Sequence, residues 1–147
     1  YAQNTKTLIN LQRPAYADSE EIVTVNDRNQ LTQVNLEKIY FDFDKANIRP
    51  DAAVTLDKLV DLMKKYPEMD IEVASHTDQR GSDSYNLALS RRRAQSTVDY
   101  VVSKGIDRIR LNAKGYGETD PIHACPSGDC TEAQFDENRR SEFTLLK

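Results

Sequence analysis

The chain has 147 residues, of which 38% are hydrophobic and 30% charged, and its formal net charge is -4. This length suits one compact domain with some additional chain, and the composition is that of an ordinary soluble protein. The acidic balance argues against nucleic acid as a partner, because nucleic-acid-binding proteins usually carry a basic surplus. No run approaches the ~18 apolar residues of a membrane span, and no signal peptide is visible. We therefore expect a mature or trimmed form, in which any membrane association depends on parts outside this chain.

Residues 1–35 are polar and irregular, with short apolar stretches at 8–9 and 22–25 that are compatible with strands. Pro14 interrupts this segment, because proline cannot donate to a strand ladder. We predict that residues 1–35 form a linker or the tail of a preceding domain. Residues 36–147 form the predicted folded domain.

The domain opens with an alternating apolar pattern over residues 36–43, which predicts a strand. An amphipathic helix is predicted next, from about Asp51, which favours the positive end of the helix dipole, to Tyr66, since Pro67 stops it. Its apolar positions recur at intervals of three and four residues, at Ala52, Leu56, Leu59, Val60 and Met63.

A second strand is predicted at 69–77, followed by a polar loop at 78–83 and a second helix at 84–104. Gly105 is well placed as the C-terminal cap of this helix, because glycine tolerates the left-handed conformation. The predicted apolar stripe of the helix consists of Leu87, Ala94, Val98, Val101 and Val102.

The remaining elements are a strand at 108–114, with Ile109 and Leu111 on its apolar side, a short helix at 131–136 and a last strand at 139–146. The order is therefore β-α-β-α-β-(α)-β. We predict an α+β fold in which two long helices pack on one face of a small mixed sheet.

The two cysteines, Cys125 and Cys130, lie five positions apart in a loop-like Cys-Pro-Ser-Gly-Asp-Cys stretch. A local disulfide is the first interpretation, which implies an oxidising compartment and a stabilisation of about 2 kcal/mol. The alternative is a zinc site with His123 as a third ligand, but no fourth ligand is evident nearby.

One strand-to-helix junction brings together groups that suit a zwitterion. Asp78 lies just past the second predicted strand, Asn86 lies in the first turn of the next helix, and Arg93 follows two turns later on the same face. An ammonium would pair with Asp78, and a carboxylate would receive a two-pronged hydrogen bond from Arg93. Backbone N–H groups near Ser84 and Tyr85 could add contacts. By spacing alone, a solvated face or a structural salt bridge is the more common explanation for such residues.

Four motifs occur in a characteristic order: His-Thr-Asp-x-x-Gly from His76, Tyr-Asn-x-x-Leu-Ser-x-x-Arg-Ala from Tyr85, Gly-Tyr-Gly-Glu from Gly115, and Asn-Arg-Arg from Asn138. Together with the opening strand, they resemble the OmpA-like C-terminal domain over about residues 36–147. This resemblance implies a periplasmic module, not an enzyme, that binds peptidoglycan non-covalently through the diaminopimelate of the stem peptide. Such a module tethers an outer membrane protein or lipoprotein to the cell wall of a Gram-negative bacterium.

The resemblance also implies roles for individual residues. Asp78 would face the diaminopimelate ammonium, and Arg93 would bind its carboxylate. Asn86 would hydrogen-bond the ligand, and Tyr85 and Thr77 would line the site. Arg139 would add a second positive contact, and Asp42 would border the groove. No cofactor, metal or catalytic residue is implied.

The chain departs from the family pattern at two positions. Ser75 stands where the family usually has glycine, and Ser141 stands where it usually has valine. Neither change removes a proposed ligand contact. His76 is expected to be structural, with its ring hydrogen-bonded beneath the loop, because no nucleophile accompanies it in a recognisable motif. The glycines around Tyr116 are expected to serve backbone conformation.

Two further functions remain as alternatives. A protein-interaction scaffold would keep the fold and lose wall binding, and the intact Asp78, Asn86, Arg93 and Arg139 argue against this. A wall hydrolase would need a metal site or a separated carboxylate pair, and neither is clear in the sequence. The acidic turn that begins at Asp42 does not have the glycine and glutamate spacing of an EF-hand.

Overall fold

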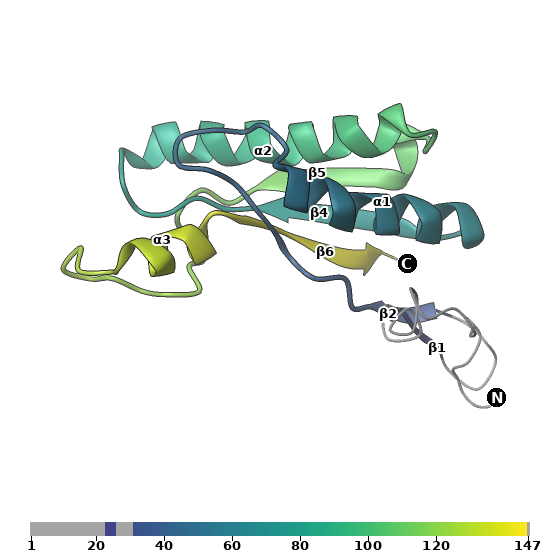
Figure 1. The fold of residues 1–147 in the computed structure, drawn as a ribbon, viewed down its shortest axis with the longest axis horizontal. Coiled ribbons are helices and arrows are strands. Elements are labelled where there is room, and N and C mark those ends of the chain that lie inside the picture. The colour runs from purple at the N-terminus through teal and green to yellow at the C-terminus, as the bar shows by residue number, and fades with distance from the viewer. Residues whose placement is uncertain (1–22, 26–30, 147) are drawn as a thin grey trace.

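The structure is a computed structural model, and it describes residues 23–25 and 31–146. A four-stranded mixed sheet in the order β3-β6-β4-β5 carries α1 and α2 side by side on one face, as Figure 1 shows. The α+β fold predicted from the sequence is confirmed. The elements are β1 (Val23–Val25), β2 (Leu31–Val34), β3 (Ile39–Tyr40), α1 (Pro50–Lys65), β4 (Asp70–Ser75), α2 (Asp83–Ser103), the 3-10 turn η3 (Arg108–Arg110), β5 (Leu111–Gly115), α3 (Glu132–Asn138) and β6 (Arg140–Leu146).

The sheet is mixed because β4 and β5 are parallel, with Ile71 opposite Leu111, whereas β6 is antiparallel to both β3 and β4. Alternation along β4 buries Ile71, Val73 and Ser75 beneath the helices. The ends of β4 and β5 and the start of β6 meet at one edge of the sheet. The loops that follow β3 and β4 lie at this edge.

Helix α1 follows the predicted pattern. Pro50 occupies the first turn, where its missing N–H costs nothing, and Asp51 lies beside the positive end of the dipole. The helix ends before Pro67. Every predicted apolar position is buried, and the full buried set is Ala52, Thr55, Leu56, Leu59, Val60, Leu62 and Met63.

Helix α2 begins one residue earlier than predicted, because the Ser82 hydroxyl caps it by accepting from the Tyr85 N–H. Gly105, with φ +106°, follows the C-terminal end as predicted. The predicted stripe is correct at Ala94, Val98 and Val101, which are buried, whereas Leu87 and Val102 are only partly buried. Towards its N-terminus the buried face is largely polar. Its buried residues are Asn86, Leu89, Ser90, Arg93, Ala94, Thr97, Val98 and Val101.

The first predicted strand, 36–43, is much shorter than expected. Only Ile39 and Tyr40 pair with β6, and Phe41 adds one further hydrogen bond to the Arg139 carbonyl. The chain then leaves the sheet in a turn, in which the Lys45 N–H donates to the Asp42 carbonyl and Asp44 has φ +59°. The alternation in the sequence could not reveal this turn, because the carbonyls of Asp42 and Lys45 accept hydrogen bonds from Arg93, a side chain of α2.

The strand predicted at 108–114 begins with the 3-10 turn η3. The Asp107 carboxylate accepts from the Ile109 N–H, and the Arg110 guanidinium donates to the Tyr66 and Met69 carbonyls. This turn leaves Ile109 84% exposed. The expectation that Ile109 faces the core was therefore wrong.

Strands β1 and β2 form an antiparallel hairpin within the segment predicted to be linker or tail. Val23 and Val34 are buried in the same hydrophobic cluster as the sheet and the two long helices. The strand suggested around 22–25 is thus present at Val23–Val25, whereas residues 1–22 lie outside the described residues. A domain boundary at residue 36 stays a prediction. No helix in the described parts of the chain is both long and apolar enough to span a membrane.

Gly115 is required by close packing and not by its backbone dihedrals. A Cβ at this position would lie 2.6 Å from both the Arg91 backbone nitrogen and the Ser90 hydroxyl of α2. Gly117 does have a positive φ, of +62°, and its N–H donates to the Ser90 hydroxyl. The two glycines let the end of β5 lie directly against α2, behind the loop that follows β4.

The two departures from the family pattern are partners in this fold. Ser75 and Ser141 lie opposite each other in the β4–β6 ladder, and both are fully buried. Their hydroxyl oxygens are 2.5 Å apart and share a hydrogen bond. A glycine at 75 with a valine at 141 would fill similar space without a polar pair.

We predict that Ser75→Gly and Ser141→Val each lower the free energy of unfolding by about 1–3 kcal/mol, because each leaves a buried hydroxyl unpaired. The double variant removes both hydroxyls, so its loss should be smaller than the sum of the single losses. Urea unfolding of the four proteins measures this coupling. Strictly additive losses would show that the two hydroxyls do not stabilise each other.

His76 continues β4, with its N–H donated to the Arg140 carbonyl, and its ring is 2% exposed. The expected hydrogen bond to the ring is not formed, since neither ring nitrogen has a hydrogen-bond partner among the described residues, and the Glu142 carboxylate lies 3.9 Å from Nε2. The ring instead stacks on Tyr116, with centroids 5.3 Å apart. Burial, followed by the charge of Arg140, lowers the pKa of His76 to about 4.

We predict that His76 makes the protein sensitive to mild acid. Its folded pKa lies below the ordinary value of 6.5, so the unfolded state takes up the proton first. The free energy of unfolding that is fully present above the ordinary pKa of 6.5 decreases as the pH falls towards 4. The loss is on the order of 2–3 kcal/mol at about pH 4.5. His76→Phe keeps the stacking and sacrifices no hydrogen bond, so its unfolding free energy should fall less between about pH 7 and about pH 4.5. Equal losses in the two proteins would contradict this assignment.

Candidate functional site

A hollow of about 420 Å³ opens between the turn after β3, the loop after β4 and the first turns of α2. Six of the seven predicted site residues line it, and they come from β4, α2 and the α3–β6 junction. They are Thr77, Asp78, Tyr85, Asn86, Arg93 and Arg139. The seventh, Asp42, does not line the hollow. Its exposed side chain lies 3.6 Å from Arg49, while its carbonyl accepts from Arg93.

Asp78 lies at the base of the hollow with only 3% of its surface exposed. Its Oδ1 accepts from the backbone N–H and the Nε of Arg80, at 2.9 and 3.2 Å. Its Oδ2 accepts from Nη2 of Arg80 and Nη1 of Arg139, at 2.9 and 3.1 Å. Burial opposes ionisation of this carboxyl, but the hydrogen bonds from Arg80 and Arg139 outweigh it and hold the pKa below its ordinary value.

Arg139 joins the site to the rest of the sheet. Its Nε donates to the Phe41 carbonyl at 2.9 Å, its Nη1 to Asp78, and its Nη2 to Asp136 at 2.9 Å. The side chain is 7% exposed. The residue predicted to be a second positive contact thus also fixes the position of Asp78.

Arg93 is fully buried and is satisfied by backbone carbonyls. Its Nε, Nη1 and Nη2 donate to Lys45, His76 and Asp42 at 2.8, 3.0 and 3.0 Å. Each terminal nitrogen retains a second N–H. Burial, and then the nearby charge of Arg139, lowers the pKa of Arg93 to about 10, so the guanidinium stays charged at neutral pH.

The remaining predicted residues contribute in different ways. Asn86 Nδ2 donates to Glu118 at 2.6 Å and to the Asp78 carbonyl at 3.3 Å. The Thr77 hydroxyl is buried and has no hydrogen-bond partner among the described residues. The Tyr85 hydroxyl, at the rim of the hollow, donates to Asp44. The Tyr85 N–H is already bonded to Ser82, so the expectation that it is free for a ligand was wrong.

The role of Arg80 was not predicted from the sequence. This side chain lies over Asp78, with the centre of its guanidinium 4.3 Å from the Phe43 ring centroid and 4.2 Å from that of Phe135. Its Nη1 and Nη2 also donate to Glu132, at 3.3 and 3.4 Å. Phe43, Arg80 and Phe135 are separated by dozens of residues, and only the folded chain brings them together.

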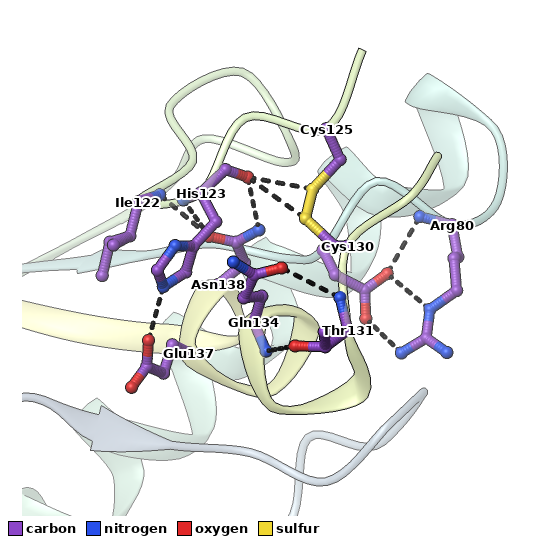
Figure 2. The surroundings of a disulfide bond; sticks show 10 residues. Arg80, Ile122, His123, Cys125, Cys130, Thr131, Gln134, Glu137 and Asn138 are labelled. Atoms are coloured by element: carbon purple, nitrogen blue, oxygen red, sulfur yellow. Dashed lines mark hydrogen bonds and ion pairs between the residues drawn. A yellow bond between two sulfur atoms is a disulfide. The ribbon is translucent and has the colours of Figure 1, made fainter. Parts of the chain in front are cut away.

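The cysteine loop borders the site through α3, and Figure 2 shows its contacts. Cys125 and Cys130 form the predicted disulfide, so the alternative zinc site is excluded because both sulfurs are bonded to each other. Asn138 holds the loop by accepting from the Ile122 and His123 N–H groups and donating to the His123 carbonyl. His123 itself contacts Glu137 at 2.5 Å.

Comparison with known proteins agrees with this architecture. The chain matches the OmpA family over residues 40–134. It is 40% identical over 109 residues to the peptidoglycan-associated lipoprotein of Rhizobium meliloti (strain 1021), which covers 74% of this chain and 60% of the relative. The protein of the same name from Brucella suis biovar 1 is 37% identical over 109 residues, covering 74% of this chain and 62% of that relative. The chain thus spans less than two thirds of these curated relatives.

Solved structures share the fold. The peptidoglycan-associated lipoprotein from Burkholderia pseudomallei superimposes with a TM-score of 0.69 and 27% identity, covering 74% of this chain and 89% of that one. The cell wall anchor of the T6SS from Pseudomonas aeruginosa superimposes with a TM-score of 0.63 and 25% identity, covering 90% and 92%. With its four motifs, its mixed sheet and this match along most of its length, the chain belongs to the OmpA family.

Proposed function

We propose that this chain binds peptidoglycan non-covalently through the diaminopimelate of the stem peptide. In this way it would tether an outer membrane protein or lipoprotein to the wall in the periplasm. The observation that carries the proposal is a single hollow in which the Asp78 carboxylate lies among the guanidinium groups of Arg93 and Arg139. The names of the relatives, peptidoglycan-associated lipoprotein and cell wall anchor, support the same function.

The chemistry of the ligand matches this arrangement. The side-chain end of diaminopimelate carries an ammonium and a carboxylate on one carbon, so its receptor needs an anion and a cation a few ångströms apart. Asp78 is kept ionised by its arginine partners, and Arg93 keeps its charge with one N–H remaining on each terminal nitrogen. The unpaired Thr77 hydroxyl offers one more polar group, since a buried hydroxyl without a partner is costly unless a ligand satisfies it.

Binding fits the site better than hydrolysis does. A general acid or base works best with a pKa near the working pH, whereas the pKa of Asp78 is lowered and its oxygens already accept hydrogen bonds. The disulfide agrees with an oxidising compartment such as the periplasm. Affinity for one stem peptide should be modest, and the repeated ligand of the polymer would add avidity.

We predict that Asp78→Asn weakens binding to diaminopimelate-type peptidoglycan by about tenfold or more, because it removes the charge that pairs with the ammonium. Co-sedimentation with purified peptidoglycan measures this loss. Asp99→Asn is a matched control, since Asp99 pairs with Arg108 on the surface of α2, away from the hollow. This control should pellet like the native chain.

Peptidoglycan with lysine in place of diaminopimelate tests the carboxylate, because lysine keeps the ammonium and lacks the second acid group. The native chain should pellet less with this polymer. Each variant is first checked for folding by circular dichroism. Equal sedimentation of the native chain and a folded Asp78→Asn variant would refute the proposed site.

A further inference from the structure

The Asp78 carboxylate has no acceptor position left for a ligand. Each of its two oxygens accepts two hydrogen bonds, three of them from Arg80 and one from Arg139. A carboxylate offers about four lone-pair sites, so all are in use. An incoming ammonium can reach Asp78 only if one of these donors leaves.

Arg80 is the donor that can leave. Arg139 is 7% exposed and is held at its other nitrogens by the Phe41 carbonyl and Asp136. Arg80 is 33% exposed, and its remaining polar partner is the 70% exposed Glu132. Its side chain contributes one bond to each oxygen of Asp78, so its departure would free one acceptor position on each, while its backbone N–H could remain in place.

Arg80 also has contacts that do not involve Asp78. Its guanidinium lies between the rings of Phe43 and Phe135, which favour a cation over their faces. Glu132 lies on its solvent side at 3.3 Å. These contacts remain available to Arg80 when it releases Asp78, so its departure would cost only the side-chain bonds to that carboxylate.

We propose that Arg80 is an intramolecular competitor of the ligand, a cation that occupies the ammonium position on Asp78 until a stem peptide displaces it. This inference rests on the proposed function and adds a specificity device to it. A neutral or weakly basic group cannot replace a guanidinium on a buried carboxylate. Only a full positive charge, presented together with a carboxylate for the remaining arginines, compensates for the exchange.

The experiment compares the affinity of a soluble stem tripeptide ending in meso-diaminopimelate for the native chain, Arg80→Met and Arg80→Gln, by isothermal titration calorimetry. Both substitutions remove the competing cation, and methionine retains an apolar side chain between the two rings. We expect both variants to bind about tenfold more tightly, since they free Asp78 in advance. The same peptide with its side-chain amine acetylated should show no gain.

Arg92→Met is the matched control. Arg92 is exposed on α2 beside Tyr85, 5.8 Å from the ring centroid, so its loss removes one positive charge near the hollow without touching Asp78. Its affinity should equal that of the native chain. An equal gain for Arg92→Met would show a general charge effect and overturn the competitor assignment.

The other outcomes separate this inference from the proposed function. If the native chain binds the tripeptide and Asp78→Asn does not, but both Arg80 variants bind no more tightly than the native chain, Arg80 is not a competitor; weaker binding would identify it as a ligand contact. The proposed function then stands. If the tripeptide binds neither the native chain nor the Arg80 variants, the proposed function fails and the competitor role falls with it. Binding to the Arg80 variants alone would support both.

Discussion

The structure depends on one buried cation. The Arg93 guanidinium is removed from water entirely, and a charge in that position is tolerated only when its N–H groups find acceptors. The carbonyls of Asp42, Lys45 and His76 provide them. These three carbonyls belong to two different segments, the turn after β3 and the end of β4. A single side chain from α2 therefore sets the distance between the segments that form two walls of the hollow.

A second group of contacts comes from three successive residues where α3 ends and β6 begins. Asn138 fixes the disulfide loop, Arg139 fixes Asp78 and the end of β3, and Arg140 donates to the Asp120 carbonyl and to Glu142. Most of these bonds are charge-assisted or buried, which makes them stronger than exposed ones. These buried residues surround Arg80 and Phe43, which are more accessible. The buried residues maintain the shape of the site, whereas Arg80 is placed to exchange partners.

Sequence patterns predicted most of this fold, because its long elements obey simple periodicities. Helix α1 and the second half of α2 show the spacing of one apolar face, and proline, serine and glycine mark their ends. The motif residues gather in one hollow because they follow strand ends and helix starts. The failures have a common cause. The short β3, the exposed Ile109 and the position of the Arg80 guanidinium all depend on contacts between a side chain and a distant segment, and no local pattern encodes such a contact.

The same logic explains why Ser75 and Ser141 look like independent departures in the sequence and are a pair in the sheet. Sixty-six positions separate them, and only the β4–β6 register places one opposite the other. His76 is a related case. A histidine beside an aspartate suggests acid–base chemistry, whereas the fold uses its ring as a flat partner for Tyr116.

If a polymer binds in the hollow, the short β3 strand would carry mechanical load. Figure 1 shows the β1–β2 hairpin at the opposite end of the molecule from the start of α2, and the segment between β2 and α1, which includes β3, runs from one end towards the other. Tension between a bound polymer and the chain on the N-terminal side of β1 would run along β3, which pairs with β6 through only two residues. The carbonyls at the end of this strand are held by Arg139 at Phe41 and by Arg93 at Asp42. Arg93 and Arg139, which line the hollow, would thus pass such a load directly to the backbone, and they reinforce the strand at the point where its own ladder is shortest.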